Sequence, residues 1–375
     1  MTLKVMTIVG TRPEIIKLSR VISELDQHTR HVLVHTGQNY ARELNSLFFE
    51  QLDIRTPDYF LDAARDTAAE TIAAVISRVD AVFAKEMPDA LLILGDTNSC
   101  LSAIAAKRRK IPIFHMEAGN RCFDDRVPEE VNRRIIDHIS DINLVYTEHA
   151  RRYLLAEGVR PETVIKTGSP MREVLDYYEP KISASRAVAR LKLTPGDFFL
   201  VSAHREENID NPANLAHLLA ALKAIVQRYR KRVIVSTHPR TRKKLATLSK
   251  SAIPQKVEFM KPMGFMDYVK LQQSAYCVLS DSGTLTEESS ILGFPAVMIR
   301  QSHERPEGMD QATLVMSGLK PEDVIAAIDV TAKQYAANAR PFAAPPDYDA
   351  TDVSQKVVRI VLSYVDVVNR TVWFK

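Results

Sequence analysis

Cysteine is scarce in this 375-residue chain, which contains three residues of that type. Cys100, Cys122 and Cys277 are too few and too widely spaced for a disulfide framework or a zinc site. Long apolar runs are lacking too, since none approaches the ~20 residues that span a bilayer. Residues 1–9 run into Gly10 without a small-residue cleavage site, which predicts a buried strand rather than a signal peptide. We therefore expect a cytoplasmic protein without a membrane partner.

The chain has almost no excess charge of either sign. Lys and Arg number 50 against 46 Asp and Glu, and a net charge of +4 is weak support for a nucleic-acid partner, so none is expected. Hydrophobic residues at 46% and charged residues at 26% exclude a disordered chain. Sequence repeats and low-complexity tracts are absent. At roughly 100–200 residues per domain, the length predicts two domains.

Short apolar runs alternate with segments of helical period along the whole chain. Because the runs are continuous rather than alternating, they favour parallel sheets covered on both faces, and hence α/β, doubly wound domains. The predicted strands are residues 3–9, 31–35, 90–94, 113–115, 143–146 and 164–167, then 198–202, 233–236, 257–259, 277–280 and 296–299. A charged helical stretch over 171–190 separates the two halves, so we predict domains at 1–180 and 181–351, followed by a last helix from about 352.

Two doubly wound domains that face each other bind ligands in the cleft at the carboxyl ends of their strands. The first strand ends in Gly10-Thr11-Arg12-Pro13, with a helix predicted from the proline. Arg12 and Lys17 would then lie near a positive helix terminus that suits a phosphate, although a solvent-facing basic turn also fits. Neither G-x-G-x-x-G nor a P-loop motif occurs, which removes the main support for a dinucleotide or P-loop site.

Three carboxylates follow neighbouring strands of the first domain: Asp96, Glu117 and Glu129. Grouped carboxylates raise one another's pKa and supply general acids and bases. For Asp96 a helix-capping role is an equal alternative, and a residue such as Glu129 in a first helical turn commonly complements the helix dipole.

In the second domain, polar residues follow four of the predicted strands. His204 lies in S-A-H-R-E-E-N without a second ligand at metal spacing, which favours an acid, a base or a phosphate donor; His238 is a weaker case. In S-D-S-G-T-L-T-E-E, the N–H groups of Ser282 and Gly283 would meet a diphosphate, and Glu288 would reach ribose hydroxyls. A capping box ending at Glu287 fits the same letters. The loop around Arg305 reads as a binding loop.

Taken together, these blocks resemble the non-hydrolysing UDP-N-acetylglucosamine 2-epimerase family. GTRPEIIK, TGQ, GDTNS, HMEAGNR, PEEVNRR, HREEN, THPR, SDSGTLTEE and ERPEG occur in order from Gly10 to about Gly318. The resemblance implies a GT-B-like fold with two Rossmann-like domains and a C-terminal helix, about 352–375, that packs back on the first. It also implies inversion at C2 of a UDP-linked N-acetylhexosamine without a cofactor or metal, by elimination of UDP to a 2-acetamidoglucal and re-addition, in a homodimer.

The resemblance also implies roles for individual residues. UDP would be held by Arg12, Tyr268, Ser282, Gly283 and Glu288, with Thr284 next to them among the substrate-binding residues. The sugar and diphosphate would be surrounded by Lys17, Asp96, Glu117, Glu129, Arg133, His204 and Arg305. Within this second set, the catalytic groups would be Asp96, Glu117, Glu129 and His204.

Two alternatives stay open. TGQNY, PEEVNRRIIDHISD and HERPEGMD are closer to a capsule and O-antigen subgroup, whose substrate is UDP-2-acetamido-2,6-dideoxy-L-talose and whose product is UDP-N-acetyl-L-fucosamine. A GT-B glycosyltransferase would share the fold and the UDP site but would need no carboxylates at C2. Because TGQ continues as Asn39-Tyr40-Ala41 instead of His-Arg-Gln, we do not expect the second, allosteric UDP-sugar site of some relatives.

Overall fold

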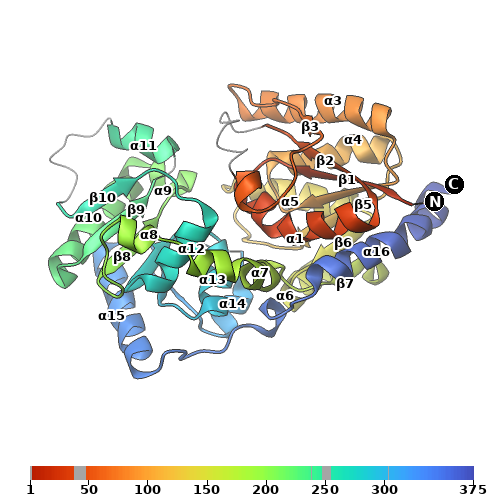
Figure 1. Cartoon of the computed structure of the whole chain (residues 1–375). Helices are drawn as coiled ribbons and strands as arrows, with labels where there is room; N and C mark the ends of the chain where they lie inside the picture. The colour runs from red at the N-terminus through yellow and green to blue at the C-terminus, as the bar shows by residue number, and fades with distance from the viewer. Residues whose placement is uncertain (1, 38–47, 238, 247–254, 303) are drawn as a thin grey trace. The chain divides into compact units, whose positions relative to one another are not determined.

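The computed structural model describes every residue except 1, 38–47, 238, 247–254 and 303. The chain divides into two compact units (Figure 1). The first comprises Met1–Tyr177 together with Pro346–Lys375, and the second comprises Tyr178–Pro345. Each unit is built around a parallel sheet with helices on its faces, so each is a doubly wound, Rossmann-like α/β domain of the GT-B-like kind.

The sheet of the first unit has the order β3-β2-β1-β4-β5-β6-β7 with all neighbours parallel. Its strands are β1 (Lys4–Val9), β2 (Arg30–His35), β3 (Tyr59–Phe60), β4 (Ala90–Leu94), β5 (Ile113–Ala118), β6 (Ile142–Val145) and β7 (Val164–Lys166). The strand order reverses between β1 and β4, which pair with Val5 opposite Ala90. Ligands of open α/β sheets bind at such a reversal, beyond the carboxyl ends of the strands.

The helices of the first unit cover both faces of this sheet. They are α1 (Arg12–His28), α3 (Ala68–Glu86), α4 (Ala103–Arg108), α5 (Pro128–Ile139), α6 (Glu148–Ala156), α7 (Met171–Ser183), which runs into the second unit, and α16 (Val353–Val368). The apolar residues of α3 and α4 pack on one face, while α16, from the far end of the chain, packs against α1 (Figure 1).

The sheet of the second unit has the order β10-β9-β8-β11-β12-β13, again fully parallel. Its strands are β8 (Phe198–Ser202), β9 (Arg232–Ser236), β10 (Val257–Met260), β11 (Cys277–Ser280), β12 (Ala296–Met298) and β13 (Val315–Met316). Here the order reverses between β8 and β11, so the segments after these two strands are the expected ligand-binding positions.

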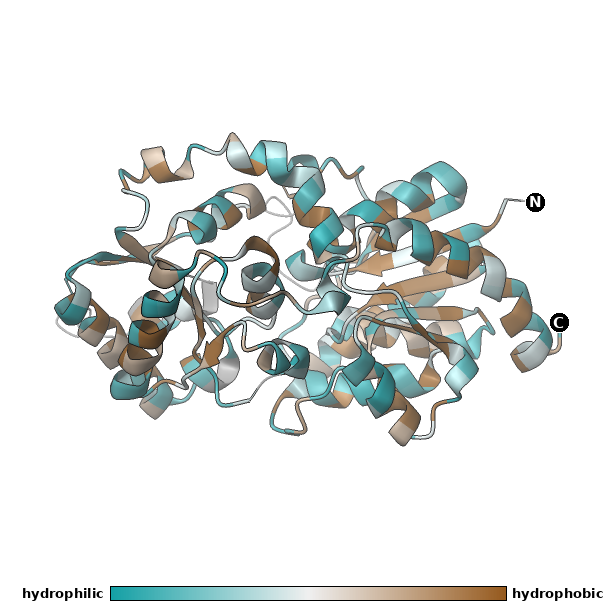
Figure 2. Cartoon of the chain, turned by 90° about the horizontal axis from the view of Figure 1, so that it is seen from below, coloured by the Kyte–Doolittle hydropathy of each residue, from teal (hydrophilic) through white to brown (hydrophobic). Residues whose placement is uncertain are grey.

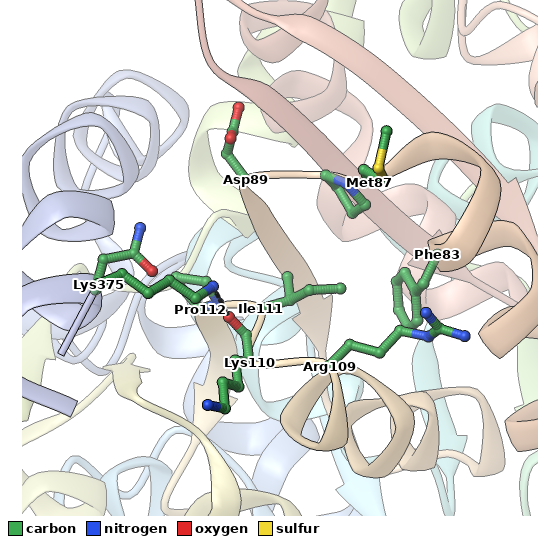
Figure 3. Close-up of a pocket in the computed structure, with 10 residues that line it drawn as sticks. Phe83, Met87, Asp89, Arg109, Lys110, Ile111, Pro112 and Lys375 are labelled. Carbon is green, nitrogen blue, oxygen red and sulfur yellow. Dashed lines mark hydrogen bonds between the residues drawn. The ribbon is translucent and has the colours of Figure 1, made fainter. Parts of the chain in front are cut away.

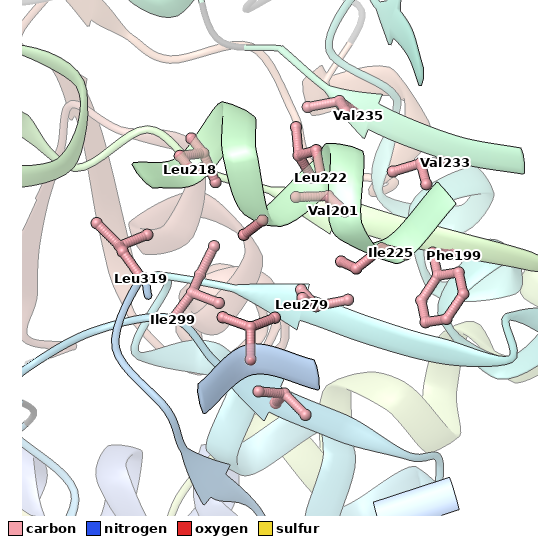
Figure 4. Close-up of a cluster of buried hydrophobic side chains, with 14 of the residues drawn as sticks. Phe199, Val201, Leu218, Leu222, Ile225, Val233, Val235, Leu279, Ile299 and Leu319 are labelled. Carbon is pink, nitrogen blue, oxygen red and sulfur yellow. The ribbon is translucent and has the colours of Figure 1, made fainter. Parts of the chain in front are cut away.

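Alternate strand residues of the second unit enter two separate cores. Phe199 and Val201 of β8 pack with α10 and α15 (Figure 4). Phe198 and Leu200 pack with residues of α12 and α13 in the other core. The strands are therefore apolar on both faces, as their colouring in Figure 2 shows. The helices are α8 (Ala187–Arg190), α9 (Glu206–Ile209), α10 (Pro212–Tyr229), α11 (Pro239–Ala246), α12 (Phe265–Ser274), α13 (Thr284–Leu292), α14 (Pro306–Asp310) and α15 (Pro321–Ala337).

The predicted strands all occur, within two residues at every end except the carboxyl end of β5, which extends three residues further. Two strands were not predicted: β3 and β13 are two residues long and lie at sheet edges, so they leave no apolar run. The predicted helical stretch over 171–190 is interrupted, because α7 ends at Ser183, three residues after Pro180, and α8 begins at Ala187.

Candidate functional site

The turn after β1 is organised by a buried carboxylate. Glu14 Oε2 accepts the N–H groups of Gly10 at 2.6 Å and Thr11 at 3.0 Å, and its other oxygen accepts the hydroxyl of Thr97, which follows β4. Burial raises the pKa of Glu14 to about 7. This places Arg12 at the first position of α1, where a helix terminus favours an anion.

Lys17 and Glu117 form an ion pair within the first unit. Lys17 Nζ lies 2.6 Å from Glu117 Oε2, and the Lys17 side chain is 3% exposed. Glu117 has φ of 62° and lies at a register shift between β5 and β6, so a β-bulge turns its side chain out of the strand. A non-glycine residue in the left-handed region is costly, and such strain is concentrated at functional sites.

Asp96 does not cap a helix. Its carboxylate accepts from Arg133 Nε at 2.7 Å, whereas the following helical turn is capped by the Thr97 side chain, which accepts the N–H of Ser99. The capping alternative for Asp96 is therefore wrong. Arg133 also reaches Glu130 Oε2 at 2.7 Å, so one guanidinium bridges two carboxylates.

Two adjacent glutamates of α5 have different environments. Glu130 is fully buried, pairs with Arg133 and accepts the N–H of Cys122. Glu129 is partly buried in the first turn of the same helix. Glu129 was predicted from the sequence as a site residue, and Glu130 was not.

The second unit orients His204 through a buried aspartate. Asp281 is fully buried and accepts the N–H groups of His204 and Arg205 and the side-chain amide of Asn208. His204 Nδ1 lies 3.3 Å from Asp281 Oδ1, while the imidazole stays 40% exposed. A partly exposed imidazole beside a buried carboxylate is the arrangement of an oriented acid or base.

The start of α13 differs from its sequence-based expectation in two ways. The Ser282 N–H donates to the Ser280 side chain at 3.0 Å, so it is engaged within the chain. The side-chain cap is absent, because Gly283 holds the capping position and Glu287 instead pairs with Arg305 at 3.0 Å. The capping-box alternative is thus wrong. The Ser282 and Thr284 hydroxyls lie 3.0 Å apart, and both residues are only partly buried. They are therefore polar groups at the amino-terminal start of α13.

The absence of a side chain at Gly283 lets a carboxylate approach the main chain. A Cβ there would lie 2.3 Å from Glu304 Oε1, an atom that also accepts from Arg205. The second Glu304 oxygen accepts from Arg300 at 2.9 Å. With Arg305, these side chains place three guanidinium groups close to the start of α13.

Glu288 and Tyr268 lie beside each other in the second unit. The buried Gln272 donates its amide to Glu288 Oε2 at 2.6 Å and so fixes the carboxylate. Burial, with Glu288 as a further contribution, raises the pKa of the Tyr268 hydroxyl. Tyr268 therefore stays a neutral donor.

Sequence reasoning missed the buried residues that hold these groups, chiefly Glu14, Glu130, Asp281 and Glu304. One signal was available: Thr11 and Glu14 have the T-x-x-E spacing of a capping box, which α1 forms. The TGQ residue Gln38, the Asn39–Ala41 continuation and His238 lie outside the described residues.

A pocket of the first unit lies away from these groups. Pro88, Asp89, Ile111 and Pro112 line it just before β4 and β5, which is the amino-terminal edge of the sheet (Figure 3). Within the described part of the chain, no cluster of three or more His, Cys, Asp or Glu side chains suits a metal ion. The described helices also include none with the length and apolar character to cross a bilayer.

Comparisons with known proteins identify one family. Residues 23–362 match the model of a family described as UDP-N-acetylglucosamine 2-epimerase. A protein of that name from Methanococcus maripaludis is 34% identical over 333 residues, which cover 87% of this chain and 91% of that protein. The structure of UDP-N-acetylglucosamine 2-epimerase from Rickettsia bellii is 57% identical, covers 100% of both chains and gives a TM-score of 0.94. The Methanocaldococcus jannaschii UDP-GlcNAc 2-epimerase, solved with UDP-GlcNAc and UDP, is 31% identical, with a TM-score of 0.89 over 96% of this chain and 100% of that one.

Proposed function

Since this chain belongs to the UDP-N-acetylglucosamine 2-epimerase family, we propose that it is an isomerase that interconverts UDP-GlcNAc and UDP-ManNAc. The observation that carries the proposal is the pair of carboxylate–cation contacts in the first unit, Lys17–Glu117 and Asp96–Arg133. Asp96 follows β4, and Glu117 lies near the carboxyl end of β5, the strand that pairs with β4.

The proposed reaction has two half-reactions. The C2–H bond breaks and its proton passes to a carboxylate, while the C1–O bond breaks and UDP leaves with the electron pair, which yields 2-acetamidoglucal. UDP then adds back to C1, and C2 receives a proton from the opposite face. Carboxylates move the proton and cations stabilise the departing diphosphate, which are the two kinds of group that these residues supply.

We assign the proton-moving roles to Asp96, Glu117 and Glu129, with His204 as a further acid or base. The UDP-binding roles go to Arg12, Tyr268, Ser282, Gly283, Thr284 and Glu288, and Lys17, Arg133 and Arg305 serve the sugar and diphosphate. The location of the residues supports this division, because the three carboxylates lie in the first unit and most of the UDP-binding groups lie on or near α12 and α13 of the second.

Turnover in D₂O tests the mechanism. The proton lost in elimination exchanges with solvent, so deuterium should appear at C2 of the product, with small amounts of UDP and 2-acetamidoglucal. NMR of the purified protein with UDP-GlcNAc, and separately with UDP-2-acetamido-2,6-dideoxy-L-talose, identifies the substrate. If the protein turns over the L-talo sugar and not UDP-GlcNAc, the proposed substrate is wrong. Retention of the original C2 proton would exclude elimination. Stoichiometric release of UDP would indicate a hydrolase or a glycosyltransferase.

We also propose that the protein is a homodimer. Phe123 is 65% exposed, and Val131 and Ile135, four residues apart on one face of α5, are also exposed. Light scattering measures the oligomeric state. The double variant Val131→Glu, Ile135→Glu should shift the protein towards the monomer if this face of α5 forms the dimer interface. A cytoplasmic location is proposed from the three free cysteines and is tested by cell fractionation.

A further inference from the structure

A buried histidine lies behind the two segments that carry Asp96 and Glu117. His115 is fully buried on β5, two residues before Glu117. Its Nε2 lies 2.8 Å from the carbonyl oxygen of Gly95, the residue before Asp96. Its Nδ1 lies 2.9 Å from Asp137 Oδ1, a carboxylate on α5. The ring therefore connects the end of β4 to α5.

Both neighbours of the ring are acceptors. A carbonyl oxygen carries no proton, and the Asp137 carboxylate already accepts the N–H of Gly119 at 3.2 Å and the Arg121 guanidinium at 2.7 Å. Burial alone would raise the pKa of Asp137, but His115 and Arg121 beside it hold the value below its usual range. Each ring nitrogen thus faces an oxygen that carries no proton of its own.

From this geometry we infer that His115 is a buried imidazolium that acts as a positioning residue for Asp96 and Glu117. Its Nε2–H fixes the Gly95 carbonyl beside Asp96. Its Nδ1 lies against the Asp137 carboxylate, which in turn accepts the Gly119 N–H two residues beyond Glu117. The inference rests on the proposed function, in which Asp96 and Glu117 act on the substrate.

The charges around His115 can balance a second buried cation beside Arg121. Arg121 pairs with Asp137 and, through two N–H groups, with Glu157 at the end of α6. Two carboxylates therefore face one guanidinium and one imidazolium. His138 lies on the outer side, with Nε2 3.1 Å from Glu157, and it contacts neither Gly95 nor Asp137 in the contacts described. A neutral His115 would leave Arg121 as the cation paired with the buried Asp137 carboxylate in the contacts described, and it would present one ring proton to two acceptors.

His35 supplies an internal reference for the opposite state. It is also fully buried, but its Nδ1 accepts the N–H of Gly37 at 3.0 Å and its ring stacks on Phe60. Burial lowers the pKa of His35 to about 4. Two buried histidines of one unit should thus differ in protonation at neutral pH.

NMR of the full-length protein with ¹⁵N-labelled histidine decides the protonation state without any assay of turnover. At pH 7 the His115 signals, assigned by their loss in His115→Gln, should show two protonated ring nitrogens. The His35 signals should show one protonated and one unprotonated nitrogen. An unprotonated nitrogen at His115 would overturn the inference, whether or not the protein epimerises UDP-GlcNAc.

Kinetics decide the positioning role. His115→Gln keeps a donor towards Gly95 and His115→Asn keeps one towards Asp137, but neither carries charge. Each should lower kcat by about 10- to 100-fold, the loss that a displacement of about 1 Å produces, with KM and the Kd for UDP within about threefold. Asp137→Asn should behave alike, and the control His138→Gln should keep wild-type kcat. Folded His115 variants with unchanged kcat would exclude the role, whereas an inactive wild-type protein would instead refute the proposed function.

Discussion

Lys17 Nζ and Glu117 Oε2 lie 2.6 Å apart although their residues are 100 positions apart in the chain. Lys17 comes from the second turn of α1, and Glu117 is turned out of β5 by the bulge at its end. The pair joins α1, which follows β1, to the end of β5, which is separated from β1 by β4 in the sheet. It brings a cation against a carboxylate that we assign to proton transfer.

The two residues of this pair should be energetically coupled in turnover. Glu117→Gln and Lys17→Met should each lower kcat by about 10²–10⁴, the range for removal of a general acid or base. In the double variant kcat should fall by less than the product of the two single-variant factors, because each group depends on the other for its catalytic role. Steady-state kinetics on the four proteins measure the coupling. Strictly multiplicative losses would show that the contact has no catalytic role.

Glu129 and Glu130 provide a matched pair that separates catalysis from stability. Glu129→Gln should lower kcat by about 10²–10⁴ in a protein that unfolds at the same urea concentration as wild type. Asp96→Asn should lower kcat over the same range. Glu130→Gln should instead lower the free energy of unfolding by about 3 kcal/mol, because Arg133 loses a buried partner. Near-wild-type activity when Asp96, Glu117 and Glu129 are all neutralised would remove the carboxylate mechanism.

These two glutamates also show what a sequence can predict. Parallel strands end at one edge of a sheet, so the apolar runs before Gly95-Asp96 and Ser280-Asp281 predict that these segments follow strands at that edge, as they do after β4 and β11. Which of two adjacent carboxylates is buried depends on a rotation of about 100° on α5 and on the position of Arg133 from the same helix. The left-handed conformation of Glu117 and the Glu304 contact at Gly283 likewise arise from packing between segments distant in sequence. No local pattern predicts them.

Glu14 should make stability fall as the pH rises through neutrality. Burial raises its pKa from 4.5 to about 7, so the folded protein binds this proton more tightly than the unfolded chain does. The contribution is complete below pH 4.5 and is lost as the pH rises through 7; at about 1.4 kcal/mol per pKa unit it amounts to about 3 kcal/mol. Glu14→Gln presents an oxygen to Gly10 and Thr11 and an amide to Thr97, which mimics the protonated acid. Urea unfolding at pH 5 and pH 8 should show the fall in wild type and a smaller one in the variant. Equal falls would assign the pH dependence to other groups.

Gly283→Ala should weaken UDP binding through a steric clash, without any change of charge. The residue has φ of −61°, which alanine adopts freely, but the added Cβ would lie 2.3 Å from Glu304 Oε1 and 3.6 Å from Arg305 Nε. Displacement of Glu304 would disturb its contacts with Arg205 and Arg300. We expect a loss of about 10-fold in UDP affinity by calorimetry, equivalent to about 1.4 kcal/mol. An affinity equal to that of wild type would show that Glu304 relaxes without consequence.

Ser282→Asp should abolish UDP binding while the protein stays folded. The new carboxylate would lie just before the first turn of α13, where we propose that the diphosphate binds, and like charges within a few ångströms at low effective dielectric repel by several kcal/mol. The affinity should fall on the order of 100-fold or more, which corresponds to about 2.7 kcal/mol. Stability should hardly change, because a negative side chain near a helix amino terminus is favourable. Ser282→Asn is the matched control, since it has nearly the same shape without the charge and should retain most of the affinity. Calorimetry that gives wild-type UDP affinity for a folded Ser282→Asp protein would place the diphosphate elsewhere.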